Sequence, residues 1–305
     1  MHLLHIAARH ARICLVLGLV AGLTLPGVAQ IIKPWLPLLV AFLLLLSSVR
    51  IGLRAALGSF ADLRQTATLV TVFQLALPLL ALAVIFLAGL TESQLALAIV
   101  LMLSAPSITG SVNFTALMGH DPAPPMRLLI FGTAVFPLTV LPVLWLMPGL
   151  GDASDVLLAA LMLLFVIALS VGLGFALRRA VLTPPTEAQI RALDGASAIV
   201  LAVMVVGLMS ALGPALRSVP GEVLFWLVAV LITNFGLQSA AYVLGQSPGA
   251  SVVAGNRNVA LFLVALPAEA VDPLLIFIGC YQIPMYLTPI VMDRIYRRHT
   301  PSSTC

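Results

Sequence analysis

The segment Ala254-Gly255-Asn256-Arg257-Asn258 places an arginine inside a stretch that is otherwise apolar enough to cross a membrane. Every other Lys, Arg, Asp and Glu falls in a connection, at a terminus or in the end turn of an apolar stretch. A lone charge at membrane depth costs about 2.5–3.5 kcal/mol on insertion scales, so it indicates a functional site. Irregular backbone at that depth is tolerated only when protein or a wet cavity surrounds it. The sequence therefore predicts a positively charged polar site near the middle of a bilayer.

The composition is that of a membrane protein. Hydrophobic residues make up 61% of the chain and charged residues 9%, and the mean hydropathy is +1.15. Soluble domains contain roughly 25% charged residues. Stretches long enough to span a bilayer as helices cover residues 11–29, 32–50, 66–89, 94–118, 126–148, 155–179, 195–216, 221–246, 249–270 and 273–294. We therefore expect an all-α polytopic membrane protein with ten transmembrane helices, numbered here as spans 1 to 10.

The basic residues in the connections predict the orientation of the spans. With the N-terminus inside, 12 of the 15 Lys and Arg residues are cytoplasmic, 2 are outside and Arg257 is the last. The cytoplasmic set is Arg9, Arg12, Arg50, Arg54, Arg64, Arg127, Arg178, Arg179, Arg191, Arg294, Arg297 and Arg298, and the outer set is Lys33 and Arg217. Because positive charge accumulates on the cytoplasmic side, we expect both termini in the cytoplasm, with the protein in the cell (inner) membrane. The net charge of +4 is then a topology signal, and no nucleic-acid partner is expected.

The first 30 residues also allow another interpretation. They contain a basic start, an apolar core and the small-residue sequence Gly27-Val28-Ala29, which together resemble a cleavable signal peptide. Cleavage there would leave nine spans and remove the symmetry described next.

The ten spans divide into two halves that are inverted relative to each other. Residues 1–148 carry spans 1–5 and residues 152–305 carry spans 6–10, and an odd number of spans per half inverts the second. Span 4 is interrupted between Ser104 and Asn113, and span 9 is interrupted at 254–258. Breaks at matching positions of inverted halves indicate a transporter binding site at their crossing.

The candidate site residues are the polar and helix-breaking residues of these two breaks, with the mid-span amides of the third span in each half. They are Arg257, Asn258, Asn256, Gly255, Asn113, Ser111, Gly110, Thr109, Pro106, Gln74, Asn234 and Gln238. Individually, such residues often only kink a membrane helix or join two helices. Their occurrence at equivalent positions favours a substrate-binding crossover. No metal-ligating or catalytic constellation accompanies them, so we expect neither a cofactor nor an enzyme.

The same residues resemble motifs of the bile acid:sodium symporter family in its broad bacterial sense. Gln74-Leu75-Ala76-Leu77-Pro78-Leu79 is similar to the family's third span. Pro106 to Asn113 resembles its first crossover motif, and Gly255-x-x-Asn258-x-x-Leu261 resembles its second. The first two spans are similar as well, so the resemblance extends over nearly the whole chain.

The resemblance implies a fold of ten helices in inverted repeats with crossing broken helices 4 and 9. Spans 3–5 and 8–10 would form a core domain, and spans 1, 2, 6 and 7 a panel domain. It also implies that an organic anion binds between the two domains and is moved by alternating access, usually with two sodium ions bound beside the crossover.

The chain departs from the family at the sodium ligands. Val253 aligns with the family's glutamate, Arg257 with a glutamine and Val112 with a serine. A hydroxyl ligand of the fifth span aligns near Leu129, with Thr133 one turn away. A hard cation requires several oxygen ligands and usually an anionic one. The substitutions predict that Arg257, which is permanently charged and carries five donors, replaces the bound cations.

The expected function is therefore secondary transport of a small organic anion, independent of sodium. Arg257 either contacts the substrate or only braces the crossover, and both roles are compatible with the sequence. A sodium-coupled uptake symporter of the bile-acid type and a transport-inactive membrane receptor on the same fold are the alternatives. Proton coupling would require an ionisable relay across the bilayer, and the Asp, Glu and His residues fall outside the middle of the spans.

Overall fold

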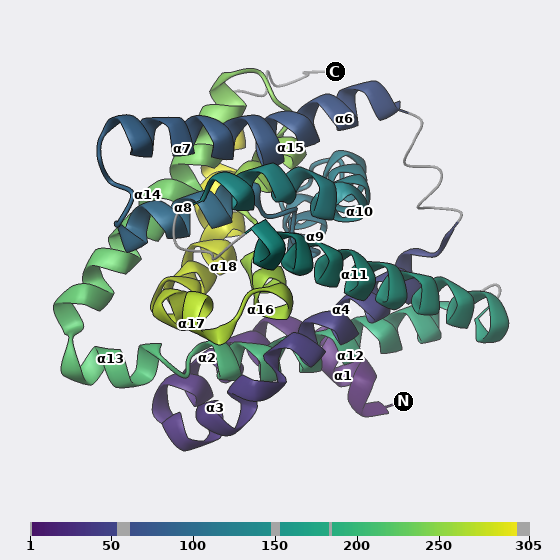
Figure 1. The fold of residues 1–305 in the computed structure, drawn as a ribbon. Helices are drawn as coiled ribbons and strands as arrows, with labels where there is room; N and C mark the ends of the chain where they lie inside the picture. Colours follow the sequence, from purple (N-terminus) through teal and green to yellow (C-terminus); the bar gives the residue numbers. More distant parts are fainter. Residues whose placement is uncertain (1, 54–61, 148–152, 183–184, 298–305) are drawn as a thin grey trace. The chain divides into compact units, whose positions relative to one another are not determined.

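The computed structural model describes residues 2–53, 62–147, 153–182 and 185–297, and the regular secondary structure of this part of the chain is helical apart from one isolated β-bridge. Figure 1 labels the elements. The first half contains α1 (His2–Arg9), α2 (Ala11–Thr24), α3 (Pro26–Ile32), η1 (Lys33–Trp35), α4 (Leu36–Ile51), α6 (Leu63–Thr71), the π-helical η3 (Val72–Ala76), α7 (Leu77–Leu87), α8 (Gln94–Ser104), α9 (Gly110–Leu117) and α10 (Ala123–Leu146). The second half contains α11 (Ala153–Val181), α12 (Glu187–Leu208), α13 (Leu212–Ser218), α14 (Pro220–Val243), α15 (Pro248–Gly255), η4 (Val259–Leu261), α16 (Phe262–Ala265), α17 (Ala268–Val271), η5 (Asp272–Leu274) and α18 (Leu275–Arg297).

Seven helical stretches of the described chain are long and apolar enough to cross a membrane. They are Pro26–Ile51, Leu63–Leu87, Ala123–Leu146, Ser154–Val181, Glu187–Ser218, Pro220–Val243 and Leu275–Arg297. The N-terminal pair His2–Arg9 and Ile13–Thr24 passes the same test together, although its two parts are bent by 86°. The chain is therefore a multi-pass membrane protein.

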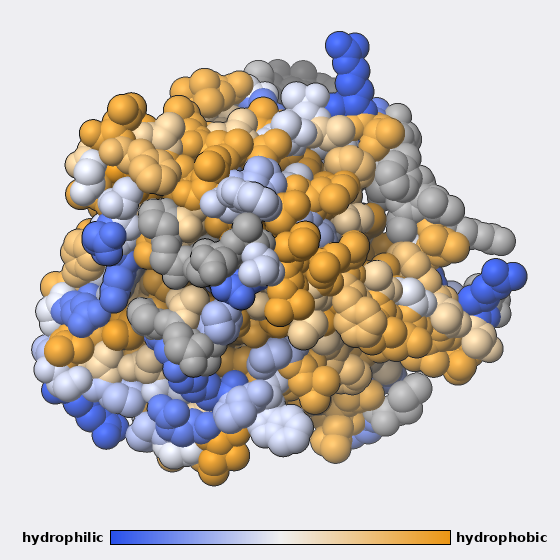
Figure 2. Space-filling model, viewed as in Figure 1, coloured by the Kyte–Doolittle hydropathy of each residue, from blue (hydrophilic) through white to orange (hydrophobic). Residues whose placement is uncertain are grey.

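The distribution of apolar side chains agrees with a lipid environment. Leu158 and Phe165 of α11 and Leu87 at the end of α7 are 65%, 62% and 90% exposed. Figure 2 shows such side chains gathered over α7 and α11. Apolar side chains exposed in such number along one helix are rare on soluble monomers, whereas a lipid bilayer would cover them.

The first predicted span does not form one helix over 11–29. Helix α2 ends at Thr24, Leu25 is non-helical, and Pro26 begins α3, which runs on toward α4. The reason is that proline disfavours a helical conformation in the residue before it while fitting the first turn of the next helix. The predicted boundary between spans 1 and 2 was therefore wrong by several residues.

The described helices belong to two compact units. Unit 1 comprises Met1–Phe60, Pro148–Val223 and Ala260–Gly279. Unit 2 comprises Ala61–Met147, Leu224–Val259 and Cys280–Cys305. Both helix breaks predicted from the sequence lie in unit 2.

Within unit 1, α12 is the central helix, and α1, α2, α3 and α4 pack against it. The closest approach is at Gly195, where an added Cβ atom would overlap the carbonyl oxygen of Leu4. Small residues at such positions allow membrane helices to touch through their backbones. Arg50 pairs with Asp194 across the α4–α12 contact. The N-terminal helix is thus an integrated part of unit 1.

Within unit 2, α10 packs against α6, α8, α9 and α15. Val70, Phe73, Leu128 and Val253 form one buried apolar cluster among these helices. Every residue of α15 from Gly249 to Gly255 is buried. The chain that leads to Arg257 is therefore held in the core of its unit.

Candidate functional site at two paired helix breaks

The first break separates α8 from α9. Helix α8 ends at Ser104, and Ala105 is extended, with φ −64° and ψ 148°. Ala105 precedes Pro106, which biases it away from the helical region. Helix begins again at Gly110. The break predicted within 104–113 is therefore confirmed, and it is shorter than that range because Gly110 to Asn113 are already helical.

The second break follows α15. The last helical hydrogen bond runs from the Asn256 amide to the Val252 carbonyl (3.0 Å), and Asn256 itself is extended, with φ −111° and ψ 93°. Gly255 allows a close approach to α14, since a Cβ atom there would overlap the backbone carbonyl of Asn234. The break predicted at Ala254 to Asn258 is confirmed.

The two broken segments pair with each other. Ser107 and Arg257 form an antiparallel β-bridge. The Ile108 amide donates to the Asn256 carbonyl (3.3 Å), and the Asn258 amide donates to the Pro106 carbonyl (2.7 Å). Backbone groups freed from one helix thus satisfy those freed from the other, which is the condition for irregular backbone in the hydrocarbon region.

The Arg257 side chain joins the ends of both helices. It is 1% exposed. Its Nε donates to the Ala254 carbonyl (3.0 Å) and its Nη1 to the Ala105 carbonyl (3.2 Å). The guanidinium carbon lies 5.0 Å from the centre of the Phe73 ring, a cation–π distance. Its Nη2 is buried and has no hydrogen-bond partner among the described residues.

The surroundings of this charge explain how it is accommodated. Ala105 caps the C-terminus of α8, and Ala254 lies in the last turn of α15. Each helix C-terminus carries a partial charge of roughly −0.5, so two of them offset much of the guanidinium charge. Half-helix C-termini of this kind are where discontinuous helices coordinate cations. The guanidinium therefore occupies a position that suits a cation.

Tyr281 of α18 bridges the second break. Its hydroxyl accepts a hydrogen bond from the Arg257 amide (2.9 Å) and donates one to the Gly255 carbonyl (2.5 Å). The tyrosine is 1% exposed. It therefore satisfies backbone groups on both sides of Asn256.

A buried polar network from α14 and α18 surrounds Asn256. Asn234 donates to the Gly255 carbonyl (2.5 Å), and Gln238 donates to Asn234 (2.7 Å) and to the hydroxyl of Thr288 (3.1 Å). The Thr288 hydroxyl lies 3.3 Å from Oδ1 of Asn256. The structure thus brings together the mid-span amides Asn234 and Gln238 and the second break.

Gln74 is buried but does not contact the guanidinium by a hydrogen bond. It accepts a hydrogen bond from Thr139 of α10 (3.2 Å). It lies in the π-helical segment Val72–Ala76, and its neighbour Phe73 covers Arg257 instead. Pro78 follows this segment and lacks the amide that would bond the Gln74 carbonyl in an α-helix, which accounts for the π turn.

The remaining predicted residues are distributed along both breaks. Asn113 and Thr109 have exposed side chains, Gly110 begins α9, and Pro106 takes part through its carbonyl. Asn258 is partly buried, and its backbone amide donates the hydrogen bond to Pro106 that pairs the two breaks.

Ser111 is fully buried, and its Oγ has no hydrogen-bond partner among the described residues.

Apart from Arg257, the positions expected to depart from the sodium-ligand pattern are apolar and buried. Val253 is 2% exposed and packs with Val70, Phe73 and Leu128. Val112 and Leu129 are each 7% exposed. Over the described residues, no group of three or more His, Cys, Asp or Glu side chains is arranged to hold a metal.

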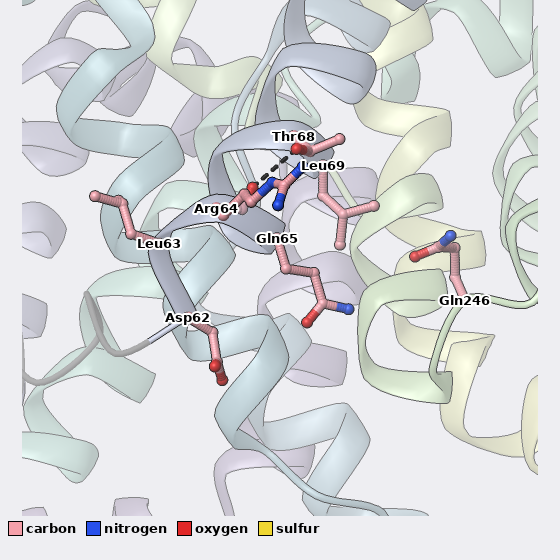
Figure 3. A pocket seen from close by; sticks show the side chains of 7 residues that line it. All are labelled: Asp62, Leu63, Arg64, Gln65, Thr68, Leu69 and Gln246. Carbon is pink, nitrogen blue, oxygen red and sulfur yellow. Dashed lines mark hydrogen bonds between the residues drawn. The ribbon is translucent and has the colours of Figure 1, made fainter.

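A separate surface pocket of about 550 Å³ lies in unit 2, at the start of α6. Asp62, Leu63, Arg64, Gln65, Thr68, Leu69 and Gln246 line it, and none of these is a predicted site residue. Figure 3 shows that Arg64, Gln65 and Asp62 point in different directions. Because these polar groups do not converge, we assign no site to this pocket.

Sequence reasoning missed three residues of the site. Phe73, Tyr281 and Thr288 all contact the second break or Arg257. For Tyr281 and Thr288 a signal was present, since they lie seven residues apart and so share one face of the last span. Phe73 gave no signal, because an aromatic residue is common in a membrane helix.

Comparison with models of protein families finds no match to the chain, and comparison with curated proteins finds none either.

Proposed function

We propose that this chain is a secondary transporter that moves a small organic anion by alternating access, without sodium, and with Arg257 in place of the bound cations. The observation that carries the proposal is the buried guanidinium at two paired helix breaks. A charged residue inside a membrane protein is costly and marks a functional site by default, and a fixed positive charge suits the binding of an anion.

The arrangement of donors supports a dual role for Arg257. Nε and Nη1 bind carbonyls of the two helix ends, so the guanidinium braces the crossover. Nη2 is a buried donor that has no hydrogen-bond partner among the described residues. The hydroxyl of Ser111, at the start of α9, is also buried and also has no hydrogen-bond partner among these residues. A carboxylate or similar group that reached the crossover would accept hydrogen bonds from such donors. The brace and the anion site are therefore two functions of one side chain.

The proposed architecture has ten spans in two inverted repeats, as in the bile acid:sodium symporter family. The seven continuous helices, the bent N-terminal pair, α8 with α9, and α15 with the segment after it supply that number. The division into a core and a panel is supported in part by the two compact units, because unit 2 holds both breaks, whereas Ala260–Gly279 of spans 9 and 10 belongs to unit 1. We further propose that both termini are cytoplasmic, from the excess of Arg on that side.

Among the described residues no carboxylate forms an ion pair with Arg257, and this bears on the energetics. Without a coupled cation, an inside-negative potential drives an anion outward by roughly 2.3 kcal/mol per charge per 100 mV. Efflux or exchange of the anion is therefore the favoured direction. The potential itself, rather than an ion gradient, would supply the energy.

The deciding experiment is flux in proteoliposomes, with and without sodium, using carboxylates of increasing size from acetate through benzoate to cholate. We expect transport of at least one of them at an equal rate in sodium and in choline. Transport only in sodium would favour the uptake symporter, and binding without transport would favour the receptor. Either result would contradict the proposal.

A second measurement addresses the ion without any substrate. Thermal stability is compared across sodium concentrations, with choline keeping the ionic strength constant. Because Val253, Val112 and Leu129 offer no oxygen ligands, we expect no saturable, sodium-specific increase in melting temperature. A saturable increase would show that another set of ligands binds the ion.

A further inference from the structure

The break after α15 leaves the Arg257 amide without a helical acceptor. The Asn256 amide makes the last helical bond, to Val252, so the Arg257 amide is the first that α15 cannot satisfy. It donates instead to the hydroxyl of Tyr281 at 2.9 Å. Over the described part of the chain, this hydroxyl is its hydrogen-bond acceptor, and both residues are 1% exposed.

The other side of the break has two donors. The Gly255 carbonyl accepts from Tyr281 and from Asn234, each at 2.5 Å. Loss of the tyrosine hydroxyl would therefore leave this carbonyl satisfied by Asn234. The Arg257 amide, in contrast, would be left buried and unpaired, which is the costly case for a buried polar group. Of the two backbone groups that the hydroxyl bonds, the Arg257 amide is thus the one that would lose its partner.

The direction of the guanidinium depends on this amide. Nε reaches back only three residues, to the Ala254 carbonyl, so its geometry is set by the backbone dihedrals between Ala254 and Arg257. The same dihedrals are fixed by the Tyr281 hydrogen bond and by the bridge to Ser107. A change at Tyr281 is therefore transmitted to the guanidinium within one turn of chain.

We propose that Tyr281 is a positioning residue whose hydroxyl holds the Arg257 backbone, and with it the guanidinium, in the orientation that binds the transported anion. The part that concerns the anion rests on the proposed transport function. The part that concerns Arg257 stands on the hydrogen bonds alone, and the two parts are tested separately.

The first test uses no ligand. Hydrogen exchange of the purified protein in nanodiscs is compared for wild type, Tyr281→Phe and a matched control, Tyr286→Phe. Tyr286 is on the same helix and has a buried hydroxyl without a hydrogen-bond partner among the described residues. In Tyr281→Phe we expect amide exchange to be faster than in the wild type, and only in the peptide that contains residues 255–258. In the control variant we expect the exchange rate of this peptide to equal that of the wild type. Unchanged exchange there, or an equal increase in both variants, would overturn the proposal.

The second test measures the KM for the carboxylate that the wild-type protein transports best in the acetate-to-cholate panel. Tyr281→Phe should raise KM by about tenfold, the scale of one hydrogen bond, with a smaller change in maximal rate. In the Arg257→Lys background, whose remaining activity allows KM to be measured, the same substitution should have a much smaller effect, because Tyr281 acts through the guanidinium of Arg257. An additive effect, or an unchanged KM in the single variant, would overturn the positioning role. If wild-type protein moves none of the panel, the transport function fails, and the exchange result still decides whether Tyr281 holds Arg257.

Discussion

At the scale of single residues, the main question is how a membrane protein keeps a guanidinium in its core when no carboxylate of the described residues pairs with it. Arg257 is balanced by the C-terminal carbonyls of two short helices and by the face of Phe73. These are fixed dipoles and a quadrupole, which require no proton or ion to be present. The positive charge is therefore constant, unlike that of a site that must first bind a cation.

Substitution of Arg257 tests whether the charge or the shape matters more. Arg257→Lys keeps the charge but loses the planar fork that reaches two carbonyls at once, so we expect most of the transport activity to be lost. Arg257→Gln also removes the charge, and we expect nearly all activity to be lost. The measurement is flux normalised to folded protein in the membrane.

The control for these variants is Arg217→Gln, which removes an exposed charge at the end of α13. We expect it to transport like the wild type. Neither Arg257 variant should fail to insert, because glutamine lowers the cost of insertion and lysine leaves it similar. Wild-type activity in Arg257→Gln would show that the charge is dispensable.

At the scale of the elements, the two breaks were predictable because their causes are local. Pro106 and Gly255 disfavour a continuous helix through their own chemistry, and their clustering with other helix-breaking residues distinguishes them from prolines inside continuous helices, such as Pro137 and Pro284. The partners that satisfy the breaks were less predictable, because they depend on packing. Phe73 lies in a π-helical turn and contacts Arg257. A π turn changes the direction in which the following side chains point, so the face that they share differs from the face expected for a regular α-helix. Gln74, expected at the crossover, bonds Thr139 for the same reason.

The close contact of α15 with α14 makes a sharp prediction about Gly255. An added methyl group would overlap the Asn234 carbonyl, so Gly255→Ala must move one helix or the other. Overpacking of a tight core typically costs about 1–3 kcal/mol, and we expect a clear decrease in melting temperature. The matched control is Gly236→Ala on α14, where a methyl group would meet no atom within 4 Å. Equal stability of the two variants would show that the backbones are not in contact.

At the scale of the whole molecule, the N-terminal residues decide how many spans the protein has. Their sequence resembles a signal peptide, yet α1 and α2 pack along α12 inside unit 1. The contact of Gly195 with the Leu4 carbonyl leaves no room for a side chain. A segment that is removed after export would leave this face of α12 without a protein partner. We therefore expect residues 2–29 to remain in the mature protein.

This prediction is tested by the intact mass of the purified protein and by reporters fused to each end. The mass should include the first 29 residues. At each terminus, a reporter that works only in the cytoplasm should be active, and a reporter that works only outside the cytoplasm should be inactive. Gly195→Leu should lower the melting temperature, because the leucine would separate α1 from α12, whereas Gly172→Leu on α11 meets no atom near its Cβ and should not. Cleavage after Ala29 would remove the partner of Gly195, and the substitution would then have no effect on stability. The mass and the variant therefore have to agree, since both depend on the same helix staying in place.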